Sequence, residues 1–510
     1  MNEMKLSDSS LGQIRHFISL ARQDLEDWHG FEAEDQYGLE AYRYQIAFMA
    51  YAIALFQYHT LPAYRELLAG TVKRLIVRLI QKPVWEFWEE VSRGAKLFDP
   101  DWTEPAQPWR DPIREKNIMY SGHVAHMIAL YEMLYRDFSW ESSDSLRFSW
   151  DQKEEFLYDQ PSVMETLYRA MMHGPSGGIE CEPNLVFPEC NQHPVLAFML
   201  NDSMHGTSYS EARHRFLRLF NSAPMIDPKT HEVIFCYRVK QGTIISKRHP
   251  ETGLPDTFVN KMKLCCSVSL FDSASACGWT GAFMNAWEPD KVRRHYEYQR
   301  DHHVRRRRRT GVSPARDTLF GNLGVGLFAT LAVEMGDTET AEQLLDYANG
   351  HYHSVWTNGS LSYPKRPDDP GSITNLAGKM IALARANTPD GIRKLHTAPW
   401  SDSDFSHPLL EKIDYPAVLV RAAHWSPEQQ RLFAILEPGD DAPAIAEFQI
   451  GGVDYHLNYA ILIDGEPFAR VAFGDDGKRE KASFIDRSSI RVRVPLPRSS
   501  VVTVHVTPAA

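Results

Sequence analysis

Residues 333–340, VEMGDTET, carry the signals that end one helix and begin the next. Gly336 suits the left-handed backbone that terminates a helix, and Asp337 or Thr338 offers a side-chain oxygen to cap the following one. Apolar residues recur at helical spacing on both sides, and Gly350 comes after the second helical segment. This stretch therefore predicts a helical hairpin whose second helix ends at Gly350.

Helical patterns of this kind fill most of the first 390 residues. Over residues 8–28, apolar side chains recur every three or four positions, which predicts an amphipathic helix with one buried stripe. Residues 33–58 are apolar nearly all round in their second half, as expected of a helix buried between layers. Further helices are predicted at 61–80, 83–90, 121–135, 161–173, 195–205, 208–221, 317–335, 338–349 and 372–387. Helices paired through short turns along such a length predict a ring, an (α/α) toroid.

The pattern changes near residue 400. The segment AVLVRAA at 417–423, and several like it, are rich in β-branched residues and alternate at the period of a strand. Asp464 and Gly465 stand between two such segments and favour a hairpin turn. The sequence thus predicts a mainly α catalytic domain over residues 1–400 and a small antiparallel β module over residues 401–510.

The composition is that of an ordinary globular protein, with 43% hydrophobic and 24% charged residues. A net charge of −11 disfavours nucleic acid or an anionic membrane surface as a partner. The chain shows no signal-peptide pattern and no run of ~18 apolar residues, so no membrane span is expected. Six cysteines are too few for a disulfide scaffold, which predicts a reduced, cytoplasmic protein. The one basic block, Asp301–Arg309, is interpreted as an exposed loop or a self-pairing surface.

Reactive side chains concentrate in residues 176–194, SGGIECEPNLVFPECNQHP. Three prolines at this density argue against a helix or a central strand, so we expect an ordered loop between helices. Cys181 and Cys190 lie nine positions apart and could face one cavity, where a thiol donates a proton or acts as a thiolate beside a cation. The alternative is that cysteines pack as small hydrophobic residues, and we prefer it for the other four, Cys236, Cys265, Cys266 and Cys277.

Two further segments could supply chemistry. Tyr120 and His123 come at the start of a predicted helix, and Gly122 would let the backbone bend to present His123. His126, one turn further on, could instead be solvated. Acids and tyrosines also gather before the second helix, where the alternative role of the acids is to cap it.

No Walker loop, GxGxxG, HExxH or Ser-His-Asp elbow is found in the sequence. Cys181, Cys190, His123 and His193 lack the tight spacing of common zinc sites. We therefore predict no metal at this site.

Several of these motifs together resemble the linalool dehydratase-isomerase family of bacterial monoterpene-alcohol enzymes. The motifs are YSGH at 120–123, LYE at 130–132, CEPNLVFPECNQHP at 181–194, RYQIAFMAYA at 43–52 and LPAYR at 61–65. The resemblance covers roughly residues 10–400 and leaves the β module out. It implies an (α/α)6 barrel with an apolar central pocket and neither a metal nor an organic cofactor. It also implies dehydration of a tertiary allylic alcohol such as linalool to a diene, with isomerisation to a primary alcohol as a further activity.

The resemblance also assigns roles to individual residues. The candidate catalytic residues are Cys181, Cys190, His123, Tyr44 and an acid before the RYQ segment, for which Asp35 is chosen over Glu40. The expected substrate-binding residues are Tyr64, Phe187 and Met119. Ala47 stands where exported members would have a disulfide cysteine, which fits a cytoplasmic protein.

Two other functions compete with this hypothesis. One is a carbohydrate-active (α/α) barrel enzyme that uses paired carboxylates from Glu180, Glu182 and Glu189. The other is a non-catalytic protein that binds an apolar ligand. The expected partner is a small apolar alcohol, and a homo-oligomer is compatible with the sequence.

Overall fold

The structure is a computed structural model that describes most of the chain. The described residues are 5–31, 34–36, 39–94, 96, 99, 101–102, 107–246, 273–307, 311–314, 324–364, 375–474, 481–497 and 502–509. For 34–36, 39–40, 273, 305–307 and 311–314 the backbone alone is described.

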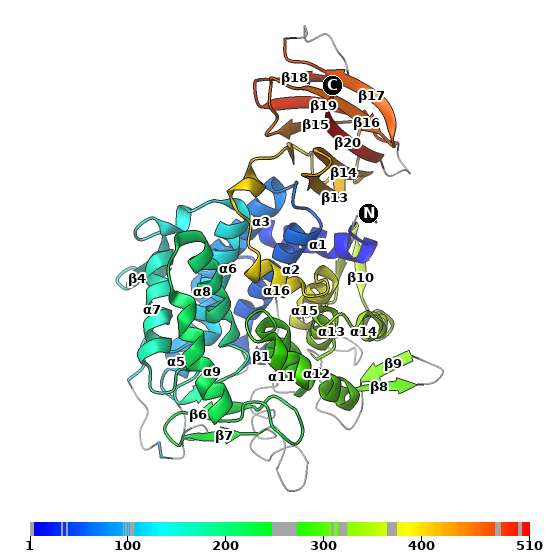
Figure 1. Cartoon of the computed structure of the whole chain (residues 1–510). Helices are drawn as coiled ribbons and strands as arrows, with labels where there is room; N and C mark the ends of the chain where they lie inside the picture. The colour runs from blue at the N-terminus through cyan, green and yellow to red at the C-terminus, as the bar shows by residue number, and fades with distance from the viewer. Residues whose placement is uncertain are drawn as a thin grey trace.

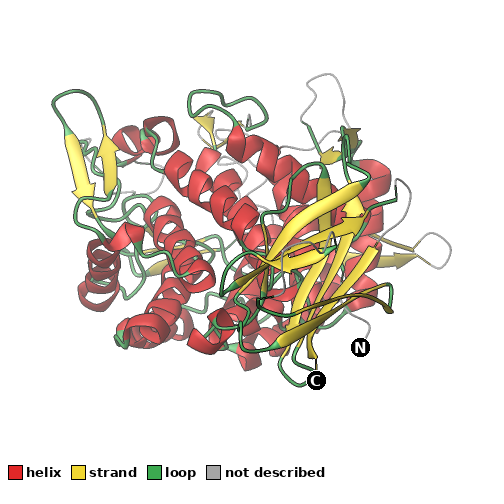
Figure 2. Ribbon diagram, turned by 90° about the horizontal axis from the view of Figure 1, so that it is seen from above, coloured by secondary structure: helices red, strands yellow, loops and turns green. Residues whose placement is uncertain are grey.

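Six of the described helices contact one another in a closed order (Figures 1 and 2). In that order they are α2 (Tyr42–His59), α6 (Ile118–Tyr135), α8 (Gln192–His205), α11 (Ser273–Met284), α13 (Gly324–Glu334) and α15 (Asn375–Ala386), which returns to α2. Every residue of α6 from Ile118 to Leu134 is buried. A helix of the ring is covered on all sides, so it needs apolar residues around its whole circumference and not only along one stripe.

Other helices pack around this ring. α3 (Glu66–Leu79) contacts α2 and α6, and α7 (Gln160–His173) contacts α6 and α8. The remaining members are α1 (Asp8–Arg22), α4 (Lys82–Trp85), α5 (Phe87–Val91), α9 (Arg213–Ser222), α12 (Pro289–His303) and α14 (Thr338–His351). Each helix of the ring therefore has at least one further helix packed against it.

The helical hairpin between α13 and α14 has the predicted stop and start signals. Gly336 has φ +76°, and the Asp337 side chain accepts a hydrogen bond from the backbone N–H of Thr340 at 3.1 Å. Both predictions are confirmed. The prediction that Gly350 ends the second helix is wrong, because α14 continues to His351 and Tyr352 N–H still bonds to Ala348.

A short helix, α16 (Gly391–Thr397), contacts α2, α8, α11 and α13 and so closes one end of the ring. Glu334, at the end of α13, accepts hydrogen bonds from the backbone N–H groups of Ile392 and Arg393 at 2.9 and 3.0 Å. A carboxylate favours the positive end of a helix, so Glu334 anchors α16.

Several predicted elements differ from the structure. The helix predicted from residue 33 begins only at Tyr42, after a hairpin of β1 (Glu34–Gln36) and β2 (Leu39–Glu40). Helices α11, α12 and α16 were not predicted. The basic block is not a loop, since it covers the end of α12 and strand β8 (Val304–Arg307), which pairs with β9 (Gly311–Pro314); residues 308–309 lie outside the described residues.

The chain beyond α16 forms two antiparallel sheets, seen at the top of Figure 1. One sheet has the order β12 (Leu409–Glu411), β15 (Ile445–Gly451), β19 (Ser489–Pro495), β18 (Ala482–Phe484). The other has the order β13 (Val418–Ser426), β14 (Arg431–Pro438), β20 (Val502–Ala509), β16 (Asn458–Ile463), β17 (Glu466–Val471). Asp464 and Gly465 both have positive φ between β16 and β17, which confirms the predicted hairpin.

The helical part and the β module are joined by hydrogen bonds. The backbone N–H groups of Leu6 and Leu410 donate to the backbone carbonyls of Arg421 and Ala63 at 2.8 and 2.7 Å. The proposed division at residues 400 and 401 falls in the segment that leads from α16 to these sheets. Within the described chain, no helix has the length and apolar character needed to cross a membrane.

Candidate active site

A cavity lies where the helices of the ring begin. Its lining residues come from the first turns of α2 and α6, the first two turns of α11, the loop of residues 176–191 before α8 (the cysteine loop), and the residue before β6 (Cys236–Arg238): Tyr44, Met119, Cys181, Glu182, Phe187, Glu189, Cys190, Phe235, Ala276 and Trp279. The volume of the cavity is about 40 Å³. The cavity is narrow and mostly aromatic and apolar, as ligand pockets commonly are.

The cysteine loop is held against the first turn of α6. The backbone N–H groups of Asn117 and Ile118 donate to the carbonyls of Cys181 and Glu180 at 3.1 and 3.2 Å. The first N–H groups of a helix have no partner inside it, so the loop satisfies them. Cys181 is thereby fixed beside Met119.

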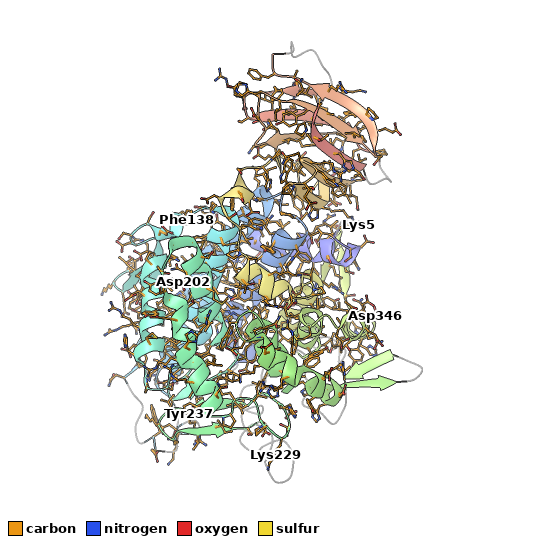
Figure 3. All side chains as sticks on the ribbon, in the orientation of Figure 1. Lys5, Phe138, Asp202, Lys229, Tyr237 and Asp346 are labelled. Carbon is orange, nitrogen blue, oxygen red and sulfur yellow. The ribbon has the colours of Figure 1, made fainter. Side chains whose placement is uncertain are left out.

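Two other contacts shape the loop. Strand β5 (Leu185–Val186) lies between the two cysteines and pairs with β6 (Cys236–Arg238), where Val186 faces Tyr237, labelled in Figure 3. Asn191 accepts from the N–H of Ile179 at 2.8 Å and donates to the carbonyls of Ile179 and Phe187 at 2.9 and 3.0 Å.

The expected loop is thus present, with one correction. Pro194 is part of helix α8, which begins at Gln192, and the prediction that this proline lies outside a helix is wrong. Proline is tolerated in a first helical turn because the N–H it lacks would have no partner there.

Cys181 and Cys190 are both free, buried thiols that line the cavity. Burial raises the pKa of Cys181 well above its ordinary value, and hydrogen bonding to Cys190 adds to this. Burial and the nearby Cys190 likewise raise the pKa of Tyr44. Cys181 and Tyr44 therefore keep their protons at neutral pH.

The structure brings together five of the predicted site residues. Cys181, Cys190, Tyr44, Met119 and Phe187 all line the cavity. The ring of Phe187 meets that of Phe235 edge-on, with centroids 5.2 Å apart.

Tyr64 lies elsewhere, so its predicted place in this pocket is wrong. It is buried beside another cavity, with Arg22, Glu66 and Tyr415. Tyr44 stands near the beginning of α2, whereas Tyr64 follows its end. Gln57, near the end of α2, donates a hydrogen bond to the carbonyl of Tyr64 at 3.2 Å, and at ~1.5 Å per residue Gln57 lies ~20 Å along the helix axis from Tyr44. The side chains of Asp35 and Glu40 lie outside the described residues.

His123 is fully buried but is not among the residues that line the cavity. Its ring lies edge-on behind Tyr44, with centroids 5.5 Å apart, and its Nδ1 is 2.7 Å from the hydroxyl of Tyr51. Within the described part of the chain, Nε2 of His123 has no hydrogen-bond partner. Burial lowers the pKa of His123, which is therefore neutral.

Two expectations about this segment are corrected. Gly122 is no bend, because it lies inside the continuous helix α6; a Cβ there would come within 3.2 Å of Pro194. Glycine thus allows α6 and α8 to pack closely. His126 is not solvated, since its exposed fraction is 0%.

A directional chain of hydrogen bonds joins three buried histidines. The indole N–H of Trp279 donates to Nε2 of His193 at 2.9 Å, so the hydrogen of this neutral ring is on Nδ1. That Nδ1 donates to Nδ1 of His126 at 3.0 Å, which leaves the hydrogen of His126 on Nε2. Nε2 of His126 donates to Nε2 of His396 at 2.8 Å, and Nδ1 of His396 donates to the carbonyl of Ile392 at 2.7 Å. Burial lowers the pKa of all three rings, consistent with this neutral chain.

Some lining residues were not predicted. Trp279, Ala276 and Phe235 are far from the cysteine loop in sequence, and no local pattern distinguishes them from core residues. Glu182 and Glu189 lie inside the quoted loop but were considered only for a carbohydrate enzyme. Cys236 and Cys277 are buried, as expected, and Cys265 and Cys266 lie outside the described residues.

Cys181, Cys190, His123 and His193 are not among the groups of described residues whose ligand atoms come close enough to share a metal ion. The chemical groups that face the cavity are thiols, a phenol, carboxyl-bearing side chains and aromatic faces.

Fold and site together define a protein built on a ring of paired helices, with a thiol-bearing aromatic cavity at the end where the ring helices begin. The sequence pattern of the linalool dehydratase/isomerase family matches residues 43–271 and 256–368. The chain belongs to this family, and the suspected resemblance is confirmed. The family indicates an enzyme with dehydratase or isomerase activity.

Similar solved structures include carbohydrate-active enzymes. The GH76 alpha-mannanase of Bacteroides thetaiotaomicron is 10% identical, with a TM-score of 0.43 and coverage of 77% of this chain and 96% of its own. An unsaturated glucuronyl hydrolase specific for heparin is 9% identical, with a TM-score of 0.43 and coverage of 74% and 95%. A possible member of the GH105 family from Salmonella enterica is 11% identical, with a TM-score of 0.40 and coverage of 76% and 95%. Similarity this low carries no conclusion about activity, and the carbohydrate alternative is not favoured.

Proposed function

We propose that this protein dehydrates small tertiary allylic alcohols of the linalool type to dienes and isomerises them to primary alcohols, without a cofactor. The observation that carries the proposal is that two free thiols line an aromatic cavity in a chain of this family. We further propose that the closed order of helices is the inner ring of an (α/α)6 barrel.

The first step is loss of water. The thiol of Cys181 or Cys190 gives its proton to the hydroxyl of the alcohol. The carbon–oxygen bond then breaks and water departs, so that an allylic cation remains beside the thiolate. A neutral thiol performs this step without a charge buried beforehand. The raised pKa of Cys181 keeps this thiol protonated until the substrate arrives.

The aromatic walls lower the energy of the cation. Tyr44, Phe187 and Trp279 present ring faces or edges to the cavity, and a ring face stabilises a cation by ~0.5–2 kcal/mol. A narrow cavity also limits the water that could recapture the cation.

The second step is loss of a proton from a carbon next to the cation, which gives the diene. Glu182 and Glu189 line the cavity, so either carboxylate can take this proton, and the proton returns to the thiolate to close the cycle. Instead, the released water can add at the far end of the allylic cation and give a proton to the thiolate, which yields the primary alcohol and restores the thiol. His123 lies behind Tyr44, so we assign it a positioning role, and Asp35 stays a candidate acid or base.

Headspace gas chromatography tests the proposal. The reduced, chelator-treated protein is incubated with linalool and with a five-carbon tertiary allylic alcohol. We expect a diene from the wild type and a loss of at least ~100-fold in Cys181→Ala or Cys190→Ala, the range of general acid–base catalysis.

The matched control is Cys277→Ala. Cys277 is also a buried cysteine and stands next to the lining residue Ala276, but it is not among the residues that line the cavity. Full activity in both Cys181→Ala and Cys190→Ala would refute the thiol mechanism. No diene from any folded wild-type sample would refute the proposed reaction.

A further inference from the structure

Glu132 belongs to the LYE segment that supports the family resemblance, yet its carboxyl group is not at the cavity. Thirteen residues of α6 separate it from Met119, which at ~1.5 Å per residue is a rise of ~20 Å. Phe138, next to this region, and Tyr237, next to the cysteine loop, are labelled at opposite ends of the helical part in Figure 3. The cavity therefore does not explain why Glu132 is present at this position.

The carboxyl group of Glu132 is isolated in the interior. Its exposed fraction is 0%, and neither Oε1 nor Oε2 has a hydrogen-bond partner in the described chain. The ion pairs of the described residues include no lysine or arginine at Glu132; the nearby Asp137 is paired with Lys73. Burial raises the pKa of Glu132 to about 9, and the charges of Glu141 and Asp137 add to this. A bare buried carboxylate is costly unless a cation or a proton compensates it.

Two other ligand groups converge on this carboxyl. Glu141 comes from the short helix η1 (Ser139–Glu141) and His205 from the last position of α8, and Nε2 of His205 lies 3.3 Å from Oε1 of Glu141. Ligand atoms of Glu132, Glu141 and His205 all lie within 4.8 Å of one another. A Zn²⁺ ion bound at ~2.0–2.2 Å needs its ligand atoms ~3–4 Å apart, so small side-chain movements suffice.

We propose that Glu132, Glu141 and His205 bind one divalent transition-metal cation, Zn²⁺ or Mn²⁺. Two carboxylates and one imidazole nitrogen suit these ions. The cation compensates the buried charge of Glu132 and joins the ends of α6 and α8 through η1. Since the site is far from the cavity, its role is structural and does not depend on the proposed reaction.

The alternative is a proton shared between Glu132 and Glu141. A shared proton would satisfy only one oxygen of Glu132 and would not use His205. A cation can bind both oxygens of Glu132 and the imidazole together.

The test is calorimetric titration of chelator-treated, dialysed protein with Zn²⁺ and then with Mn²⁺. Glu132→Gln should lose one bound equivalent relative to wild type, and His205→Ala should weaken that site at least ~10-fold. The control is Glu165→Gln, since Glu165 is a surface residue paired with Arg169 on α7. Zn²⁺ should also raise the melting temperature of wild type but not of Glu132→Gln.

A second group of potential metal ligands must be distinguished from the proposed site. The described chain holds a second group of potential ligands, Glu232, His302 and His303, so the proposal concerns only the equivalent lost in Glu132→Gln. Equal binding by wild type, Glu132→Gln and His205→Ala would mean an adventitious ion only. No binding by the wild type would support the shared proton instead. If Glu132→Gln does not fold, His205→Ala decides, because His205 lies at the protein surface.

Discussion

The indole N–H of Trp279 donates to Nε2 of His193 across 2.9 Å, and this bond links the wall of the cavity to the interior of the helix ring. Because an indole can only donate, Trp279 sets the tautomer of His193 and, through it, those of His126 and His396. The far end of this chain is α16, which closes the other end of the ring. The aromatic wall and the closing helix are thus parts of one hydrogen-bonded unit.

Replacing Trp279 by Phe keeps an aromatic ring at the cavity but removes the donor to His193. A buried acceptor left without its partner costs ~1–3 kcal/mol, so the free energy of unfolding should fall by this amount. Urea denaturation measures the change. Trp356→Phe is the control, because Trp356 is 52% exposed. Equal free energies of unfolding for the two variants would show that the hydrogen bond from Trp279 to His193 does not stabilise the fold.

The buried histidines make stability depend on pH. Burial lowers the pKa of His396 to about 4, whereas an unfolded histidine titrates near 6.5. Below pH 6.5 the unfolded chain therefore binds more protons, and stability falls as the pH drops towards 4. Because the pKa of His396 differs by about 2.5 between the folded and unfolded chains, at ~1.4 kcal/mol per pKa unit, this residue alone lowers the free energy of unfolding by ~3 kcal/mol between pH 7 and pH 4.

Urea denaturation at several pH values from 7 to 4 measures this dependence. His396→Gln should show a shallower loss of stability than the wild type over this range. His351→Gln, at the exposed end of α14, should keep the wild-type slope. An unchanged slope in His396→Gln would contradict the neutral chain.

Asn191 holds the cysteine loop in shape through three hydrogen bonds to Ile179 and Phe187. Asn191→Ala should lower the free energy of unfolding by ~2–3 kcal/mol and expose the thiol of Cys190 to labelling reagents. Urea denaturation and the rate of reaction with a chromogenic disulfide measure the two effects. Asn221→Ala serves as the control, since Asn221 is exposed and bonds only to Lys291 among the described residues. Slow labelling in both variants would mean that Asn191 does not position Cys190.

Ala276 lines the cavity from the first turn of α11, and its small side chain leaves room for substrate. Ala276→Leu should reduce turnover of a ten-carbon alcohol at least ~10-fold more than that of a five-carbon alcohol. Headspace gas chromatography of both products gives the ratio, and the shorter alcohol is the internal control. An unchanged ratio would place the substrate away from Ala276.

Local patterns in the sequence were enough for elements that depend on neighbours along the chain. Gly336 and Asp337 mark a helix end and a helix start, and Asp464 with Gly465 marks a hairpin, because the backbone preferences involved are local. The density of prolines and thiols from Cys181 to Cys190 likewise indicated an ordered loop, and both thiols line the cavity.

Other features could not be predicted because they depend on contacts between distant segments. Tyr64 looked like a partner of Tyr44 in sequence, but the length of α2 separates them. From the sequence His126 could be a solvated residue, but the ring of helices buries it. Nothing near Trp279 in the sequence indicates that it shares a cavity with Cys190 or bonds to His193.

The sequence by itself determined the α13–α14 hairpin, the β module, the cysteine loop and the family, since each depends on local backbone preference, periodicity or a motif. Only the tertiary structure decided which side chains share the cavity, how Trp279 orders three histidines, and that Glu132 meets Glu141 and His205 away from it. Closing a ring of helices places residues hundreds of positions apart within hydrogen-bond distance, and burial there changes their pKa. Neither effect can be predicted from a local stretch of sequence.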